Sequence, residues 1–439
     1  MNLQEFFNTD FVDYASYDNL RKIASCIDGQ KNASRKVLYT VLEKNIKDKI
    51  KVSQLGSKVA EFSEYLHGNM DGVIVNLAQD FAGTNNIPLL QKKGNFGTRF
   101  ANEASASRYI FTYGSDVFFK LFNKDDNNIL KSQTFEGEKI EPMFYLPSLP
   151  LLLINGSEGV SSGFAQKILP RSFKNIKQYV EDVLNNKKLN KTLLIPSFNG
   201  FNGTIIQGET NKQWIIKGQI KRINQTTLVI DEIPIGYDLK SYIKVLDTLE
   251  ESKIINAYKD LSDNDIFKFE VKMTTKDLNS LSEDELLQKL KLVKTVTENY
   301  TCLDENNKII EFESADDIIS YYIDVKYKFL CLRKDYLLRS LKKKLSILSS
   351  KITFIKKIID GELVIQKRSK SDIEKDLLQI DEIIKVNDSY DYLLNMSLYT
   401  LTKERLQKLS EEFKTCKCDI KELCDLTFNE MWMNDLKML

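Results

Sequence analysis

The strongest constraint on the fold is an apolar repeat in the last quarter of the chain. Apolar side chains recur there at alternating steps of three and four residues, which is the spacing of a helical seam that packs against a second helix. We therefore predict an antiparallel coiled-coil arm over residues 321–361 and 402–439. The first seam consists of Leu338, Leu341, Leu345, Leu348, Ile352, Ile355 and Ile359, and the second consists of Leu406, Leu409, Phe413, Cys416, Ile420 and Leu423.

Residues 362–401 separate the two seams, and a segment of this length suits a small helical domain at the tip of the arm. Lysines and glutamates occupy the other faces of both predicted helices, which favours an arm that is exposed to solvent. Two long helices packed inside an ordinary core are the alternative interpretation.

The rest of the chain follows an α+β pattern. Residues 17–90 have helical periodicity, with a turn at IDGQK before the amphipathic stretch ASRKVLYTVLEKNI and then a further helix at KVSQLGSKVAEFSEYLHG. We therefore predict a helix-turn-helix inside a domain spanning 21–170, preceded by an N-terminal arm over 1–20. Glycine and asparagine accumulate in QKKGNFGTRFANEASAS, residues 91–107, which predicts a long loop of the kind that often carries function. Alternating apolar and polar residues between turn signals predict a β-rich domain with added helices over 171–320.

Composition excludes several classes of site. Lys plus Arg is 63 and Asp plus Glu is 62, so any basic surface for nucleic acid must be local. The single histidine, His67, excludes sites that need two, and six cysteines without a C-x-x-C pair are typical of reduced thiols. The sequence has no phosphate-binding G-x-x-x-x-G-K-[ST] motif, no leader and no stretch that suits a bilayer span. We therefore expect a soluble, cytoplasmic protein that has no nucleotide site of its own.

The stretch ASASRYIFTY, residues 104–113, places Arg108 directly before Tyr109. A tyrosine at the start of an apolar run is usually a half-buried packing residue, and this is one interpretation. A phenol can instead attack a phosphodiester if its proton is removed and the charge of the transition state is stabilised. An adjacent arginine can meet the second requirement, because the donors of its guanidinium group match phosphate oxygens.

Five motifs in one order give the chain a resemblance to a known family. IDGQKNASRKVLYTVLEKNIKDKIKVSQLG is followed by EYLHG, LAQDFAGTNNIPLLQKKGNFGTR, ASASRYIFT and LPLLLINGSEGVSSGF. These stretches resemble the breakage-reunion (A-type) region of type IIA DNA topoisomerases. They look closer to the eukaryotic and T-even bacteriophage forms, and most of all to the phage medium subunit, than to bacterial gyrase. The resemblance continues through GFNGTI, LVIDEIP, IKKIIDGELVI, DYLLNM and LTKERLQKL, so it covers nearly the whole chain.

The resemblance implies roles for individual residues. Tyr109 would attack the DNA backbone and stay joined to the 5′ phosphate, with Arg108 beside it and His67 at the scissile phosphate. Val160 lies where related enzymes insert a branched aliphatic side chain between base pairs to bend the DNA. Without the resemblance, a buried structural valine is an equally good interpretation of Val160. The implied phosphate contacts are Lys31, Arg35, Lys36, Lys92, Lys93 and Arg99.

The resemblance also implies an architecture and partners. The expected parts are a winged-helix DNA-gate domain over 21–170, a tower domain over 171–320, and a C-gate dimerisation domain over 362–401 at the tip of the coiled-coil arm. Two copies would act on double-stranded DNA together with a large subunit that carries the ATPase and acidic metal-binding domains. That partner would bind ATP and hold Mg²⁺, so we expect no metal ligands on this chain. A phage-encoded protein would work in the cytoplasm of its host.

The activity implied is that of an ATP-dependent type II DNA topoisomerase. Nothing in the sequence resembles the DNA-wrapping domain of gyrase, so relaxation, decatenation and unknotting are the expected outcomes. A non-enzymatic DNA-organising or scaffold protein with a long helical arm is the alternative, with Tyr109 as a packing residue. A tyrosine recombinase would need several arginines and a histidine in one site, and the sequence shows no counterpart of that set.

Overall fold

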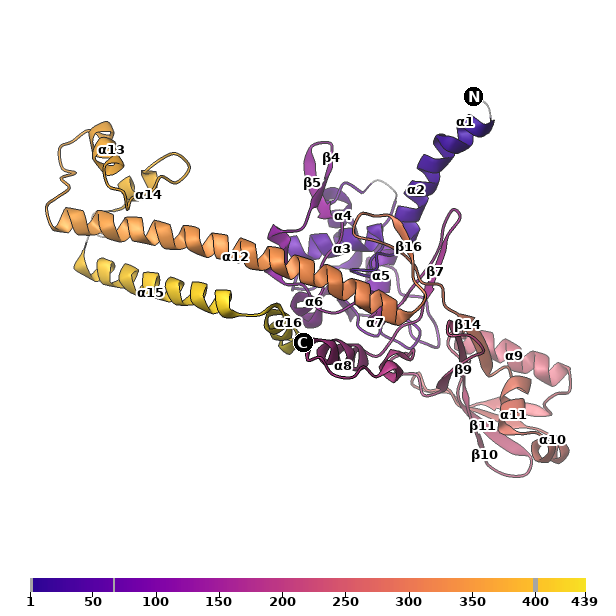
Figure 1. Cartoon of the computed structure of the whole chain (residues 1–439). Helices are drawn as coiled ribbons and strands as arrows, with labels where there is room; N and C mark the ends of the chain where they lie inside the picture. Colours follow the sequence, from indigo (N-terminus) through magenta and orange to yellow (C-terminus); the bar gives the residue numbers. More distant parts are fainter. Residues whose placement is uncertain (1–2, 66–67, 398–401) are drawn as a thin grey trace. The chain divides into compact units, whose positions relative to one another are not determined.

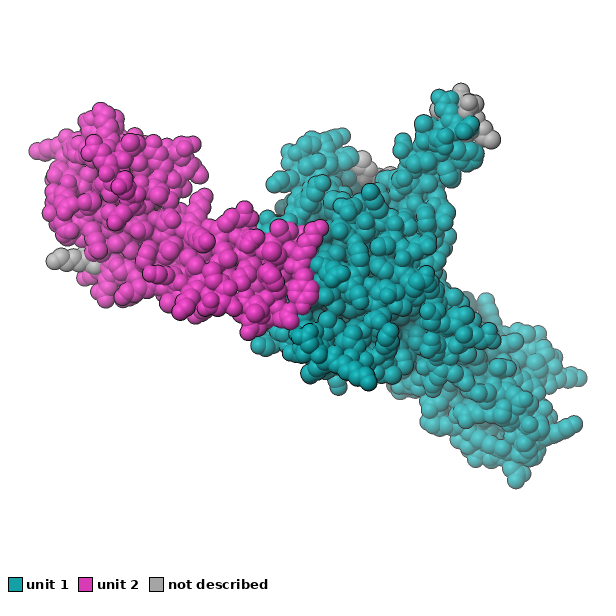
Figure 2. All heavy atoms as spheres, viewed as in Figure 1, with its two compact units in different colours: residues 1–326, 432–439 teal, residues 327–431 magenta. Residues whose placement is uncertain are grey.

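The structure is a computed structural model that describes residues 3–65, 68–397 and 402–439 (Figure 1). It combines helices and strands in two compact units. Unit 1 contains residues 1–326 and 432–439, and unit 2 contains residues 327–431 (Figure 2). The prediction of a mixed α and β chain with more than one domain is confirmed.

Short helices and hairpins form the first half of unit 1. The helices are α1 (Leu3–Asn8), α2 (Asp10–Lys22), α3 (Asn32–Glu43), α4 (Val52–Phe62), α5 (Asp71–Ala78), α6 (Asp116–Leu121) and α7 (Leu151–Asn155), with a 3₁₀ turn η1 (Lys124–Asn128). The strands are β1 (Ile50–Lys51), β2 (Leu90–Lys93), β3 (Phe111–Gly114), β4 (Ser132–Phe135), β5 (Glu138–Pro142), β6 (Ser157–Val160) and β7 (Ala165–Ile168).

Helices α3 and α4 form the predicted helix-turn-helix region, and each buries side chains spaced three or four residues apart. This spacing places the side chains on one face of the helix, so packing selects the helical conformation. The fully buried apolar residues of α3 and α4 include Val37, Leu38, Val41, Val52, Leu55 and Val59.

The second half of unit 1 contains most of its strands, as the alternation pattern predicts. The helical elements are α8 (Phe173–Leu184), η2 (Lys191–Leu194), α9 (Leu239–Glu251), α10 (Thr275–Ser280) and α11 (Glu283–Lys289). The strands are β8 (Thr204–Gln207), β9 (Gln213–Lys217), β10 (Gln219–Arg222), β11 (Thr227–Glu232), β12 (Ala257–Asp260), β13 (Phe269–Lys272), β14 (Val293–Thr297), β15 (Thr301–Leu303) and β16 (Ile309–Glu311).

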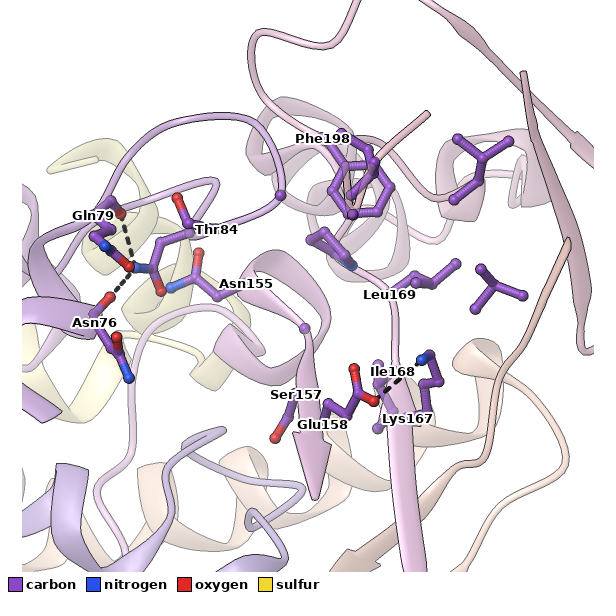
Figure 3. Close-up of a pocket in the computed structure, with 18 of the residues that line it drawn as sticks. Asn76, Gln79, Thr84, Asn155, Ser157, Glu158, Lys167, Ile168, Leu169 and Phe198 are labelled. Carbon is purple, nitrogen blue, oxygen red and sulfur yellow. Dashed lines mark hydrogen bonds and ion pairs between the residues drawn. The ribbon is translucent and has the colours of Figure 1, made fainter. Parts of the chain in front are cut away.

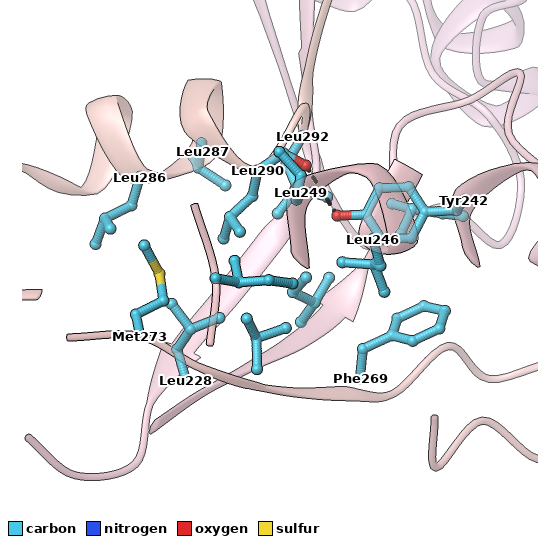
Figure 4. Packing of buried hydrophobic residues seen from close by; sticks show 14 of the residues in the cluster. Leu228, Tyr242, Leu246, Leu249, Phe269, Met273, Leu286, Leu287, Leu290 and Leu292 are labelled. Carbon is cyan, nitrogen blue, oxygen red and sulfur yellow. Dashed lines mark hydrogen bonds between the residues drawn. The ribbon is translucent and has the colours of Figure 1, made fainter. Parts of the chain in front are cut away.

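An antiparallel sheet with the strand order β10-β11-β13-β12 holds the core of this half (Figure 4). Helix α9 presents Tyr242, Leu246 and Leu249 to the sheet, and their spacing of four and three residues gives the helix one apolar face. The buried hydroxyl of Tyr242 donates to the Leu290 carbonyl at 3.0 Å, so the ring is buried without an unpaired polar atom.

A buried ion pair joins the beginning and the end of the second half of unit 1. The guanidinium of Arg171 donates to both carboxylate oxygens of Glu298, at 2.9 and 2.8 Å, and both residues are buried. The indole of Trp214 donates to the same carboxylate at 2.7 Å. These bonds fix the start of α8 against the segment that follows β14, because a buried charge is stable only when it is paired and hydrogen-bonded.

Unit 2 confirms the helical pattern of the last quarter. Its helices are α12 (Ala315–Ile359), which begins in unit 1, α13 (Lys370–Leu378), α14 (Asp391–Leu394), α15 (Lys403–Asp425) and α16 (Phe428–Lys437), which ends in unit 1. Residues of both seams pack into one apolar cluster with those of α13 and α14. The seam residues in the cluster are Leu341, Leu345, Leu348, Ile352, Ile355, Ile359, Leu406, Leu409, Phe413, Cys416 and Ile420.

Three side chains of unit 1 hold the points where the chain leaves that unit and returns to it. Tyr322 donates its hydroxyl to the Pro147 carbonyl, and Lys326 donates to the carbonyls of Leu146 and Pro147 at 3.2 Å each. Trp432 donates its indole N–H to the Ser148 carbonyl at 2.9 Å. Three consecutive buried carbonyls are thereby satisfied from α12 and α16.

All six cysteines lie in the described residues and are free thiols, as the sequence predicts. Across the described part of the chain, no helix is both long enough and apolar enough to cross a membrane.

Candidate active site

Tyr109 is exposed at one end of a small antiparallel sheet, just before its central strand. The sheet has the order β1-β3-β2, and Tyr109 lies in the turn just before β3. Its backbone N–H donates to the Ala106 carbonyl at 2.9 Å, while the next residue, Ile110, is buried and accepts from the Val52 N–H at 3.0 Å. The side chain of Tyr109 is 66% exposed, which is inconsistent with the interpretation of this ring as a packing residue.

The guanidinium of Arg108 lies over the ring of Tyr109. Its central carbon is 4.9 Å from the ring centroid, which is a cation–π contact. Both side chains are exposed, so the pair presents a phenol and a set of planar donors to the same region of solvent. A phosphate placed against the phenol would therefore meet donors that suit its oxygens.

Basic side chains flank this pair on the sheet. Lys51 of β1 and Lys93 of β2 both pair with Phe111 of β3, so the three side chains share one face. Lys49 lies with its ammonium 5.9 Å from the centroid of the Phe111 ring. The three lysines are exposed and form a local basic face beside Tyr109.

The sequence prediction includes Lys93 but not Lys49 or Lys51. These two belong to a two-residue strand and the turn before it, and a strand that short has no measurable periodicity. The available signal was the run KDKIK directly before α4, where lysines alternate with other residues.

Three of the predicted phosphate contacts, Arg35, Lys36 and Arg99, are buried and paired with carboxylates. The Nε atom of Arg35 lies 2.7 Å from the Asp28 carboxylate, and the Nζ atom of Lys36 lies 2.9 Å from the Glu141 carboxylate.

Arg99 is paired in the same way, with its Nη1 atom 2.5 Å from the Glu232 carboxylate. Burial lowers the pKa of Arg99, and Glu232 offsets this only in part. For Arg35, burial also acts to lower the pKa, but Asp28 outweighs it and the net direction is upward. In this structure the donors of these three residues are used inside the protein, where they support the fold, and their role as phosphate contacts stays a prediction.

Lys31 and Lys92 are half-buried and have partners within the protein. Lys92 forms an ion pair with Asp80. The Nζ atom of Lys31 donates to the Glu158 carbonyl at 2.6 Å, and burial lowers the pKa of Lys31. Lys31 thus supports the hairpin that carries Val160, whereas Lys92 is placed on the opposite face of β2 from Lys93.

Val160 lies at the end of the β6–β7 hairpin and is 71% exposed. This excludes the interpretation of Val160 as a buried structural residue. Phe164, at the other end of the four-residue turn Ser161–Phe164, is 37% exposed. The hairpin therefore exposes apolar side chains to solvent. This exposure is unfavourable in the free protein and is typical of a surface that contacts another molecule.

The loop after β2 turns at two glycines. Gly94 has φ = 103° and Gly97 has φ = 85°, values that favour glycine. A Cβ atom at Gly97 would also collide with the Asn102 carbonyl oxygen. The predicted loop is confirmed for residues 94–107, but its first residues, Gln91 to Lys93, are in β2.

The predicted histidine, His67, lies outside the described residues. Within the described residues, no group of three or more His, Cys, Asp and Glu side chains is arranged to hold a metal ion.

A cavity of about 450 Å³ lies between the base of the Val160 hairpin and the segment after α5 (Figure 3). Asn76, Gln79 and Thr84 line one side, and Glu158 and Lys167 line another, joined by an ion pair of 3.2 Å. Tyr109 is not among the lining residues, so the cavity and the exposed phenol are separate features.

Comparison with known proteins gives one consistent result. Residues 21–437 match the family model that describes the A-type subunit of DNA gyrase/topoisomerase IV. The chain is 34% identical over 449 residues to the mitochondrial DNA topoisomerase 2 of Dictyostelium discoideum, an alignment that covers 99% of the chain and 35% of that protein. It is 32% identical over 480 residues to DNA topoisomerase 2 of Plasmodium falciparum, covering 100% of the chain and 34% of that protein.

A solved structure is similar as well. The crystal structure of the Plasmodium falciparum topoisomerase II DNA-binding, cleavage and re-ligation domain has a TM-score of 0.88 and 32% sequence identity, covering 99% of this chain and 63% of that one. The chain spans about a third of the length of the curated relatives that it matches.

Proposed function

The chain belongs to the family of DNA gyrase/topoisomerase IV A-type subunits, and on this premise we propose that it is the DNA breakage-reunion subunit of an ATP-dependent type II DNA topoisomerase. The observation that carries the proposal is the exposed phenol of Tyr109 beneath the guanidinium of Arg108. A packing residue would be buried, and a scaffold protein has no need of an exposed phenol next to hydrogen-bond donors that suit phosphate oxygens.

In the proposed cleavage step, the phenolic oxygen of Tyr109 attacks a backbone phosphorus. A tyrosyl O–P bond forms, the bond to the 3′ oxygen breaks, the phenol gives up its proton, and the 3′ oxygen takes up a proton as a hydroxyl. Tyr109 stays joined to the 5′ phosphate. Arg108 stabilises the charge that develops on the phosphate oxygens. Resealing is the reverse attack by the 3′ hydroxyl and needs no nucleotide, because the tyrosyl ester retains the energy of the phosphodiester.

The DNA-binding surface in this proposal differs in part from the sequence prediction. Lys49, Lys51 and Lys93 contact phosphates next to Tyr109, since they are the exposed cations of the same sheet. Val160 inserts between base pairs from its exposed hairpin. His67 remains a proposed group at the scissile phosphate.

The finer architecture is part of the same proposal. Residues 1–20 are an N-terminal arm, 21–170 a winged-helix domain, 171–320 a tower, and 362–401 a C-gate domain on a coiled-coil arm. Two copies form a homodimer through the DNA gate and the C-gate. A large subunit binds ATP and holds Mg²⁺, and a cytoplasmic medium subunit of a phage enzyme fits this division of tasks. The outcomes are relaxation, decatenation and unknotting of double-stranded DNA.

The test is to incubate the chain with its large partner, a divalent ion and plasmid, then denature the mixture and measure DNA that is joined to protein. Tyr109→Phe should give no covalent product above background. Tyr113→Phe is the matched control, because Tyr113 is a half-buried tyrosine four residues away and should leave product formation unchanged. Adducts from Tyr109→Phe at the parent level would refute the assignment. A parent chain that gives none with an active partner would favour the scaffold alternative.

A further inference from the structure

The hairpin that carries Val160 is held by the last turns of α2, although the two segments lie far apart in the sequence. The Oδ2 atom of Asp18 accepts hydrogen bonds from the N–H of Ser162 at 2.9 Å and from its hydroxyl at 3.0 Å. The Oδ1 atom of Asn19 accepts from the hydroxyl of Ser161 at 2.6 Å. Both α2 residues are at least nine-tenths buried, while most of the preceding residues of α2 are exposed.

Further contacts reach the hairpin on its strand β6. The second carboxylate oxygen of Asp18 pairs with Lys22 at 3.0 Å, so both oxygens of Asp18 are used. The carbonyl of Lys22 approaches Gly159 so closely that a Cβ atom at this position would collide with it. Together with the bond from Lys31 to the Glu158 carbonyl, these contacts hold the backbone on both sides of Val160.

An apolar wedge needs such support. Separating two stacked base pairs costs about a few kcal/mol per step, and that resistance acts on the backbone that carries the wedge. An isolated two-stranded hairpin is marginally stable in water and would bend away instead. The hydrogen bonds from α2 reach the turn residues 161 and 162 directly after Val160, where displacement of the tip would begin.

We infer that Asp18 and Asn19 are positioning residues that hold the β6–β7 hairpin in place, so that Val160 can enter and bend DNA. The inference rests on the proposed function, because it assumes that DNA is the object of the hairpin. Neither residue contacts DNA in this view. They act through Val160, by holding the turn residues that follow it.

The experiment measures DNA bending by the full chain. A duplex of about 30 base pairs, long enough for a bend to shorten the distance between its ends, carries a donor and an acceptor dye. A second duplex carries 2-aminopurine at the bent step, and its fluorescence rises when the base is unstacked. Asp18→Ala should lower the bending equilibrium constant by about tenfold, the factor of one charge-assisted hydrogen bond, and Asn19→Ala by about fivefold. Both should lower the 2-aminopurine signal.

Two comparisons separate positioning from general stability. Asp13→Ala removes an exposed carboxylate from the same helix and should change neither signal. Val160→Ala should abolish unstacking, and adding Asp18→Ala to it should cause no further loss, because a residue that acts only through Val160 has no effect once the wedge is gone. If Asp18→Ala alters the thermal transition of unit 1, the Asn19→Ala variant decides the question by the same criteria.

Three results would overturn the inference, and they differ in what they mean for the proposed function. Normal bending by Asp18→Ala and Asn19→Ala, with none by Val160→Ala, rejects the role of α2 and leaves the wedge intact. Additive losses in the double variant show that Asp18 acts elsewhere. Unchanged bending by Val160→Ala, or a parent that binds DNA without bending it, rejects the wedge and the inference together, while the adduct assay with Tyr109→Phe still judges the enzyme activity separately.

Discussion

The buried ion pair of Asp28 and Arg35 predicts an asymmetric response to mutation. One carboxylate oxygen of Asp28 accepts from Arg35 Nε at 2.7 Å and from the Tyr145 N–H at 3.0 Å. The other accepts from Arg35 Nη2 at 3.1 Å and from the Gln30 N–H at 2.9 Å. Arg35 has one further acceptor, the Gln30 carbonyl at 3.0 Å. Asp28 is therefore the centre of the network, and Arg35 is one of its partners.

The two alanine substitutions leave different groups without partners. Asp28→Ala leaves a buried guanidinium without a counter-charge and removes the acceptor from two buried N–H groups, so we expect the free energy of unfolding to fall by about 5 kcal/mol. Arg35→Ala leaves a carboxylate that still accepts from two backbone N–H groups, so we expect a loss of about 3 kcal/mol.

Urea unfolding followed by tryptophan fluorescence measures this difference in unit 1, which contains Asp28 and Arg35. The chain has two tryptophans, Trp214 and Trp432, and both are buried in unit 1. Their signal therefore reports unit 1 without a contribution from tryptophan in unit 2. Asp48→Ala, which removes an exposed carboxylate, is the control and should change little. Equal losses for the two variants, or a larger loss for Arg35→Ala, would refute the reasoning.

Two further predictions concern the surface around Tyr109. Lys51→Ala should weaken DNA binding and reduce the slope of log K against log salt by about one, the effect of one lost phosphate contact. The control Lys408→Ala, in unit 2, should leave this slope unchanged. Equal slopes for the two variants in filter-binding titrations would show that Lys51 does not contact DNA. Gly97→Ala should impair cleavage and lower the melting temperature more than Gly137→Ala, because both glycines have positive φ but only at Gly97 would a Cβ atom collide with the backbone. Similar melting shifts for the two would contradict this.

The long helices of the last quarter and the helices α3 and α4 could be predicted because their signals are local. A seam such as Leu341 to Ile359 fixes its own periodicity, and the burial of these residues follows from their spacing. The strand β2 was missed because it is short and because Lys92 and Lys93 give it no alternation of apolar residues. Its existence depends on pairing with β3, which lies 18 or more residues later in the sequence.

The order of motifs led to the proposal of Tyr109 as the nucleophile, and the structure shows that its side chain is exposed. For the cations, nothing in the sequence separates the buried Arg99 from the exposed Lys93. The partner of Arg99 is Glu232, far along the chain in β11, and a pairing between residues so distant leaves no local pattern. The same holds for Val160, whose exposure depends on a hairpin held by α2.

The anchoring of Tyr322, Lys326 and Trp432 on three consecutive carbonyls has a consequence for how this chain can change over evolutionary time. The peptide leaves unit 1 after residue 326 and re-enters it at residue 432, and both points are fastened to residues 146–148. The residues between these two points therefore form an inserted segment whose two ends lie close together. Segments of this kind can be lengthened, shortened or exchanged by recombination without a change in the chain path of the surrounding unit, because closing adjacent ends costs little entropy.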